Sequence, residues 1–263
     1  MTRLENVRHR ILGAVRFVDG NTKLQIRGSL SVEAPGVKFV RNRRDYYVIW
    51  SAPGLEAHTE AFEQPPGAPP LNSVTIESRI TDPENRYLPR QFTLQLPRNS
   101  SPQHADEEES LFQPVDVRLF PAPTMKTASG WAVVRATVVA EGTDEALPGA
   151  MIRVLRTSDS ELLARGLSDW RGKAKGQALV TVPGIPITTW GDGNGEDDDE
   201  PVIVNEIQVT LETFFDPDFA PTAGDLPDPE DLETRGATLP SSNTTVQLAS
   251  GRTIAISLAV PLP

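Results

Sequence analysis

The chain has 263 residues with 25 Lys or Arg, 36 Asp or Glu and no cysteine, which excludes disulfides, thiolate catalysis and cysteine-bound metal. Its 24 prolines and 19 glycines favour many short strands and turns over long helices. Residues 1–100 hold 14 basic against 10 acidic side chains and residues 101–263 hold 11 against 26, so an acidic body repels nucleic acid.

The first ten residues, MTRLENVRHR, are charged where a signal peptide would need an apolar segment. Residues 1–10 are therefore expected to form an arm, and the protein to be made in the cytoplasm without a signal peptide. The longest apolar runs have the length of strands, so membrane insertion is not expected. If the protein acts outside the cell, we expect it to be part of a released particle.

A first β-sandwich domain is predicted over residues 11–97. Apolar residues recur at every second position in several short runs, which is typical of half-buried strands. About seven strands, the number in an immunoglobulin-like or transthyretin-like sandwich, are expected in this range. Its predicted strands include 11–18, 24–32, 37–40, 46–52, 59–62, 74–81 and 92–96.

Two segments lack any periodicity. Residues 64–70 hold four prolines in seven residues and are predicted to form a loop, because proline breaks both helices and sheet ladders. Residues 98–113 begin RNSSPQHADEEES, a polar and acidic run. We predict that they form the linker between two domains.

A second β-sandwich domain is predicted over residues 114–263. In its central strand Val134, Ala136 and Val138 should face the core while Arg135 and Thr137 face water. The same alternation returns at 150–154, 178–182, 207–211 and 254–262. The fold class is therefore predicted as all-β, with two sandwich domains.

Long insertions are predicted at 190–201 and 216–243 of the second domain. Both are rich in Asp, Gly, Pro or Ser, and neither composition can form a core of its own. We expect both to protrude, with one helical turn at 229–234.

The first insertion is a candidate cation site. Asp192, Asn194, Glu196 and Asp198 alternate as oxygen ligands do at the start of a calcium loop. The run fails the EF-hand pattern, since the turn glycine and the closing glutamate are absent. A solvated hairpin tip is the alternative, and no metal or other cofactor is assigned.

The turn at 41–45 carries Arg41, Arg43 and Arg44, which could hold a carboxylate-rich partner through bidentate contacts. The acidic loops of a neighbouring copy would be such a partner. The alternative is a solvated turn whose charges discourage pairing between sheet edges.

Trp170 and Trp190 lie in predicted turns and are candidate contact anchors for a partner. Together with the other scattered aromatic residues they could also stack on sugar rings, although core packing explains most of them. A carbohydrate-binding module or adhesin subunit is therefore the alternative function.

No reaction is indicated by the sequence. The three histidines, His9, His58 and His104, are scattered, and no nucleophile elbow, zinc motif or phosphate-binding loop is present. The protein is predicted not to be an enzyme. A glycoside hydrolase with two facing carboxylates is the third possibility, because 36 acidic residues leave many potential pairs.

One stretch resembles a known family. Leu147, Pro148, Gly149 and Ala150 precede a strand, and a turn with Ser168, Asp169 and Gly172 follows, as in the carboxypeptidase regulatory-like domain. The resemblance covers about forty residues. It implies a transthyretin-like sandwich that serves in folding, spacing or docking.

A weaker likeness extends over the chain. The runs at 80–98 and 130–138 resemble accessory β-proteins of phage-tail-like contractile injection particles. This implies a structural role in a baseplate, collar, cap or tail appendage. The sequence is thus interpreted as a non-enzymatic structural or docking component whose partners are other protein subunits, including copies of itself.

Overall fold

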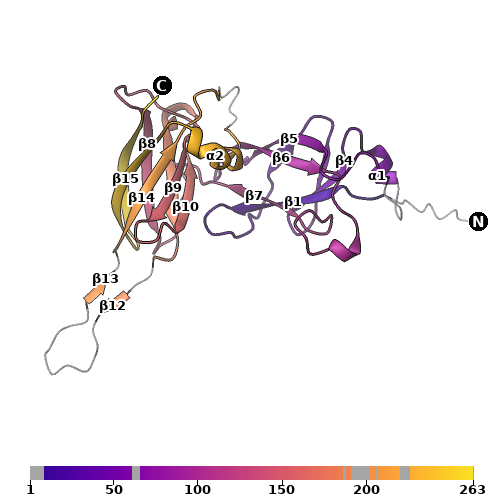
Figure 1. The fold of residues 1–263 in the computed structure, drawn as a ribbon. Coiled ribbons are helices and arrows are strands. Elements are labelled where there is room, and N and C mark those ends of the chain that lie inside the picture. Colours follow the sequence, from indigo (N-terminus) through magenta and orange to yellow (C-terminus); the bar gives the residue numbers. More distant parts are fainter. Residues whose placement is uncertain are drawn as a thin grey trace, which may run out of the picture. The chain divides into compact units, whose positions relative to one another are not determined.

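The computed structural model describes residues 9–60, 66–185, 188–190, 202–204, 206–219 and 226–262, the two short ribbons at 188–190 and 202–204 by their backbone alone. These residues form two compact units. Unit 1 comprises 9–19, 23–84 and 89–119, and unit 2 comprises 20–22, 85–88 and the described residues from 120 onward. Both units are built from β-sheets, which confirms the all-β fold class (Figure 1).

Unit 1 is a sandwich of a four-stranded sheet, in the order β3-β4-β1-β7, and a three-stranded sheet, in the order β2-β5-β6. All pairs are antiparallel except β1 with β7, which is parallel. Its elements are β1 (Gly13–Asp19), β2 (Ser31–Glu33), β3 (Lys38–Arg41), β4 (Tyr46–Ser51), α1 (Glu56–Glu60), β5 (Val74–Thr81), β6 (Arg90–Leu96), the 3-10 turn η1 (Pro102–His104) and β7 (Val115–Leu119).

Aromatic rings fill the space between these two sheets. The Phe17 ring on β1 meets the Tyr47 ring edge-on at 5.2 Å and the Phe92 ring on β6 at 5.8 Å. The Tyr47 hydroxyl donates to the carbonyl of Leu30 at 3.0 Å and accepts from its N–H at 2.7 Å. The buried hydroxyl is therefore satisfied, as burial of a tyrosine requires.

Two of the predicted strands in unit 1 are wrong. Within 24–32 only the β2 residues from Ser31 form a strand, and Leu24 is 69% exposed, because Gly28 at φ 115° turns the chain out of the extended conformation. Within 59–62, Thr59 belongs to α1, which is anchored by the fully buried Leu55, and residues 61–62 lie outside the described residues.

The segment 98–113 folds within unit 1. The Asn99 N–H donates to the carbonyl of Glu109 at 3.0 Å, and the Leu111 N–H donates to that of Asn99 at 2.6 Å, which closes a loop. The chain then adds β7 beside β1. The division between the units therefore falls after Leu119 rather than within 98–113.

Unit 2 is a second sandwich, with a four-stranded sheet in the order β10-β9-β14-β15 and a three-stranded sheet in the order β11-β8-β16. β8 and β16 are parallel, and β12 and β13 pair separately as a ribbon. None of the helices in the described residues is long and apolar enough to span a membrane. The elements are β8 (Ala132–Ala140), β9 (Met151–Arg156), β10 (Leu162–Leu167), the 3-10 turn η2 (Gly172–Ala174), β11 (Gln177–Val182), β12 (Thr188–Trp190), β13 (Val202–Val204), β14 (Glu206–Phe214), α2 (Pro229–Arg235), the 3-10 turn η3 (Gly236–Thr238), β15 (Ser241–Ala249) and β16 (Thr253–Val260).

The predicted inward residues of the central strand form the core of unit 2. Val134 and Val138 have no exposed area and Ala136 is 2% exposed, while Arg135 and Thr137 are exposed. The residues that face them from β9, β11 and β14 are equally buried and almost entirely aliphatic. The period-two alternation therefore identified this core correctly.

The second insertion, 216–243, does not simply protrude as predicted. α2 begins after Asp228, whose side chain accepts from the Glu230 N–H at 3.0 Å as an N-cap. Leu226 and Leu232 are fully buried and pack in a second apolar cluster with residues such as Phe214. These two leucines help to anchor a largely polar segment, because each fully buried leucine contributes about 2 kcal/mol, and Arg235 adds an ion pair with Asp216.

Candidate functional site

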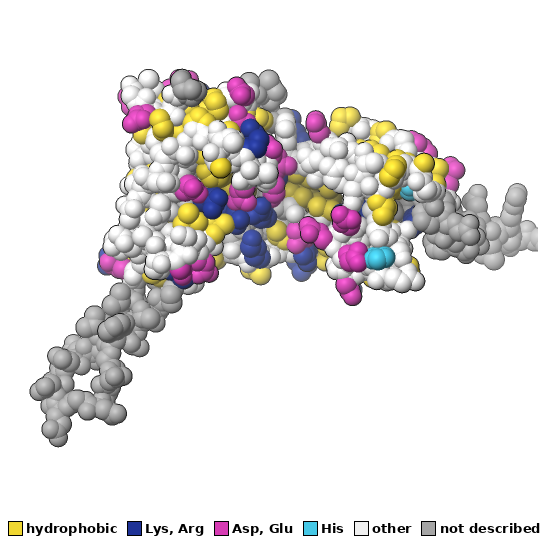
Figure 2. Space-filling model, viewed as in Figure 1, with side chains coloured by type: hydrophobic (Ala, Val, Ile, Leu, Met, Phe, Trp, Pro, Cys, Tyr) yellow, Lys and Arg dark blue, Asp and Glu magenta, His cyan; other side chains and the backbone are white. Residues whose placement is uncertain are grey.

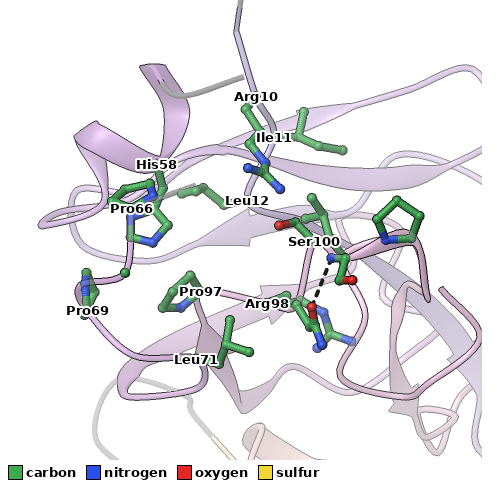
Figure 3. Close-up of a pocket in the computed structure, with 15 residues that line it drawn as sticks. Arg10, Ile11, Leu12, His58, Pro66, Pro69, Leu71, Pro97, Arg98 and Ser100 are labelled. Carbon is green, nitrogen blue, oxygen red and sulfur yellow. Dashed lines mark hydrogen bonds between the residues drawn. The ribbon is translucent and has the colours of Figure 1, made fainter. Parts of the chain in front are cut away.

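A cavity of about 580 Å³ opens in unit 1, between α1, the residues before β1 and the loops that follow β6 (Figure 3). This volume lies within the range of ordinary small-molecule sites. The lining combines apolar side chains with six polar residues, which are Arg10, His58, Arg98, Asn99, Ser100 and Ser101. The apolar wall includes Leu12, Pro66, Pro69, Leu71, Pro97 and Leu111.

Backbone hydrogen bonds hold opposite walls of the cavity in place. The Arg10 N–H donates to the carbonyl of Thr59 at 2.9 Å, which ties the residues before β1 to α1. On the other side the Asn72 N–H donates to the carbonyl of Pro97, also at 2.9 Å. The proline-rich loop after residue 65, which cannot join a sheet, therefore serves as a wall of the cavity.

Two polar side chains extend toward this cavity without a hydrogen-bond acceptor (Figure 3). His58 on α1 is only 5% exposed, and its Nδ1 is buried and unpartnered among the described residues. The Nη1 of Arg10 is buried and unpartnered in the same way. Burial lowers the pKa of His58 below its ordinary value, and the charge of Arg10 lowers it further. His58 is therefore neutral at pH 7.

Arg98 also lines the cavity, but its guanidinium is engaged. Its Nε donates to the carbonyl of Ser110 at 3.0 Å, and its Nη2 donates to the carbonyl of Glu108. Burial lowers the pKa of Arg98, while the charges of Glu108 and Glu109 act in the opposite direction. Arg98 mainly fixes the 99–111 loop, and none of the described lining residues is acidic.

A second candidate surface is the open edge of unit 2. β15 ends the four-stranded sheet and β16 ends the three-stranded sheet, and within the described residues neither has a strand paired to its outer side. The turn between them makes them neighbours, so both free edges lie on the same side of the sandwich (Figure 1). The surface over β15 carries few charged side chains (Figure 2).

The basic turn lies between β3 and β4, as predicted. Arg41 does not extend freely, because it donates to the buried carboxylate of Asp45. Arg43 and Arg44 are exposed, and no ion pair to either is found among the described residues. The Asn42 side chain fixes the turn by accepting from the N–H of Arg44 at 2.8 Å.

The two candidate tryptophans differ in what the structure shows. Trp170 is half-buried rather than exposed and packs against the second apolar cluster of unit 2. Its Nε1 is buried without a partner among the described residues. Trp190 ends β12 and pairs with Val202 of β13, and its side chain lies outside the described residues.

The candidate calcium ligands Asp192, Asn194, Glu196 and Asp198 lie outside the described residues. In the part of the chain that is described, no group of three or more His, Asp or Glu side chains is placed to hold a metal ion.

The residues of the 147–172 motif are structural. The Ser168 hydroxyl donates to the carbonyl of Leu147 at 2.6 Å and accepts from the Ala150 N–H at 2.9 Å, which joins the two halves of the motif. The Asp169 carboxylate accepts from the Arg171 N–H at 3.0 Å, as the predicted turn requires. These buried side chains position strands and leave no free group for chemistry.

Sequence reasoning missed the cavity. Arg10 was assigned to an arm and His58 was one of three scattered histidines, and no spacing connects two residues that are 48 positions apart. The only local signal was the proline-rich run at 64–70, which predicts a loop that joins neither a helix nor a sheet.

No protein-family model matches the sequence, and no curated protein matches it. Three solved structures are similar to the chain at low identity. The TIE protein of Bacillus anthracis has 9% identity and a TM-score of 0.29, over 95% of this chain and 34% of that chain. A minor pilin of Streptococcus agalactiae has 7% identity and a TM-score of 0.27, over 85% and 67%. The shaft pilin SpaA of Lactobacillus rhamnosus GG has 16% identity and a TM-score of 0.22, over 72% and 66%.

This chain thus spans about a third of the TIE protein chain and about two thirds of the pilin chains. At such scores the likeness does not extend to function.

Proposed function

We propose that the protein is a non-enzymatic structural or docking subunit of a multiprotein assembly, and that a neighbouring subunit adds a strand to the open edge of unit 2. The observation that carries this proposal is the composition of β15 and β16. The two strands read SSNTTVQLA and TIAISLAV, with neither a charge nor a proline. Natural proteins usually place charged residues or prolines on edge strands, because these residues prevent pairing with other chains.

The core beneath this edge supports the same proposal. Val246 on β15 and Ile254 and Ile256 on β16 are only partly buried, although they pack against the core. The equivalent positions of central strands, such as Val134 and Ile152, have no exposed area. An added strand would pair with the free backbone groups and cover these apolar side chains.

The exposed Arg43 and Arg44 are proposed as a separate cationic contact for a carboxylate-rich surface. Both are exposed on a turn whose backbone is fixed by the Asn42 side chain, which makes them accessible to a partner. Arg41 is not part of this contact because it is paired with Asp45. Trp190 remains proposed as a contact anchor.

A finer version of the proposal concerns the kind of assembly. The sequence resemblances described above support a place in a phage-tail-like contractile particle and a carboxypeptidase regulatory-like second domain. Electron microscopy of particles from cells that lack this protein would test it, since loss of a baseplate, collar, cap or appendage is expected. Particles of unchanged appearance and composition would contradict this finer version.

The strand-addition proposal is tested by placing a lysine on β15. Thr245→Lys puts a charge at the middle of the open edge, whereas Thr210→Lys puts the same charge on the neighbouring central strand, directly opposite in register. We expect native mass spectrometry to show that the wild-type protein associates with itself or with products of neighbouring genes. Thr245→Lys should lose this association and Thr210→Lys should retain it.

Equal loss in both variants would indicate binding to the sheet face instead of the edge. A wild-type protein that remains a monomer and binds none of these partners would refute the proposed function.

A further inference from the structure

Two side chains that line the cavity of unit 1 each carry a buried polar group that requires a hydrogen-bond partner. Arg10 Nη1 and His58 Nδ1 are both buried and both lack a hydrogen-bond partner among the described residues. Leaving such groups unsatisfied costs about 1–3 kcal/mol each, so native proteins rarely retain them without a reason. Both side chains line the same cavity, but the two nitrogens themselves are covered, so one bound group could satisfy both only if the side chains rotate toward it.

The charge of the site favours an anion. The guanidinium of Arg10 can only donate hydrogen bonds, and a neutral His58 can donate from Nδ1. None of the described lining residues carries a carboxylate that would compete for these donors. The exposed Glu108 and Glu109 act on Arg98, which also lines the cavity.

The walls favour an apolar body over a fully hydrated ion. Eight of the 15 lining residues have apolar side chains, and the space of about 580 Å³ is far larger than one oxyanion needs. A doubly charged phosphate would lose its hydration here and meet only one uncommitted guanidinium. A single negative charge on an apolar molecule matches both features of the cavity.

We propose that this cavity binds a carboxylate carried on an apolar body, and that the Arg10 and His58 side chains rotate toward it so that its two oxygens accept from the guanidinium and from Nδ1. Leu71, Pro69 and Pro97 contact the apolar part of the ligand (Figure 3). The carboxylate belongs either to a free organic acid or to an acidic side chain of a protein segment. This site does not rest on strand addition to β15, and its failure would leave that proposal intact.

Calorimetric titration of the full-length protein tests the proposal with matched ligands. The probes are 3-phenylpropionate, its neutral amide, inorganic phosphate, and a short peptide with glutamate between proline and leucine, compared with its glutamine counterpart. The acids should bind at least about tenfold more tightly than their amides or phosphate. Binding of 3-phenylpropionate identifies a free acid as the source, and binding of the glutamate peptide alone identifies a protein side chain.

Arg10→Gln should weaken binding by about tenfold or more, whereas Arg43→Gln, which removes the same charge from an exposed turn, should not change it. In NMR spectra of the wild-type protein, the ligand should shift the imidazole signals of His58 and leave those of His9 and His104 in place. This measurement does not depend on the folding of any variant.

The proposal is overturned if neither acid binds, if the acids and their amides bind equally, or if phosphate binds more tightly. It is also overturned if the signals of His58 do not move when an acid binds.

Discussion

The two units are built on the same plan, yet their interiors differ. Each combines a four-stranded and a three-stranded sheet, and in each the last strand of the sandwich runs parallel to the first. The core of unit 2 is almost entirely aliphatic and fully buried. The core of unit 1 is built around Phe17, Tyr47 and Phe92, and it also contains the charged side chain of Arg90 at 1% exposure.

The difference indicates where each unit carries its function. Small aliphatic residues pack closely together, so the core of unit 2 is well filled. The surface of unit 2 proposed to contact a partner is therefore its open edge. In unit 1, α1 and the loops around it enclose a cavity with two unsatisfied donors, and unit 1 is therefore the unit proposed to bind a ligand.

The largest expected effect comes from deleting one core side chain in each unit. Phe17→Ala should destabilise unit 1 by about 3–5 kcal/mol and Leu211→Ala should destabilise unit 2 by about 2–5 kcal/mol. If the interiors are separate, differential scanning calorimetry will show that each change lowers a different transition. A single transition that both variants lower equally would show that the two units unfold as one.

The buried arginine of unit 1 gives the next effect. Arg90 donates from Nε to the carbonyl of Gln91 and from Nη1 to that of Arg118, each at 2.8 Å, and the second bond joins β6 to β7. Arg90→Met should destabilise unit 1 by about 3 kcal/mol, because both bonds involve a charged donor. Urea denaturation would measure this loss. Arg90→Lys, which retains the charge, should lose less, and an equal loss would contradict the role of the charge.

Two buried serines allow a matched comparison between the units. Ser168 in unit 2 makes two hydrogen bonds through its hydroxyl, whereas the hydroxyl of Ser78 in unit 1 is buried and unpartnered among the described residues. Ser168→Ala should cost about 1–3 kcal/mol, while Ser78→Ala should cost nothing or stabilise the protein. The midpoint of thermal unfolding measures both. Equal losses would show that packing, not hydrogen bonding, decides the outcome.

The smallest effect is a dependence of stability on pH that belongs to unit 1. Burial and the charge of Arg10 lower the pKa of His58 below its ordinary value of 6.5, so the unfolded chain binds a proton that the folded unit does not. The stability of unit 1 should therefore fall as the pH decreases below 6.5. Chemical denaturation at a series of pH values would measure this slope. His58→Gln should flatten it, and an unchanged slope would contradict the assignment to His58.

Local patterns predicted the parts of the fold in which one face of a strand is buried. Val134, Ala136 and Val138 alternate with polar residues, and the hairpin around 41–45 has strands on both sides, because a period of two assigns the faces without reference to the rest of the chain. The same rule failed at 24–32, where Gly28 interrupts the extended backbone, and at 59–62, where Leu55 anchors a helix.

The sequence by itself determined that this protein is all-β and which residues form the core of unit 2, because alternation and turn residues act over a few positions. Only the tertiary structure decided that α2 packs against unit 2, that β15 and β16 form open edges, and that Arg10 and His58 meet in one cavity. These features depend on contacts between residues far apart in the chain, and no local spacing encodes such contacts. Both proposed contact sites therefore depend on the packing of distant segments against one another, and not on local propensity.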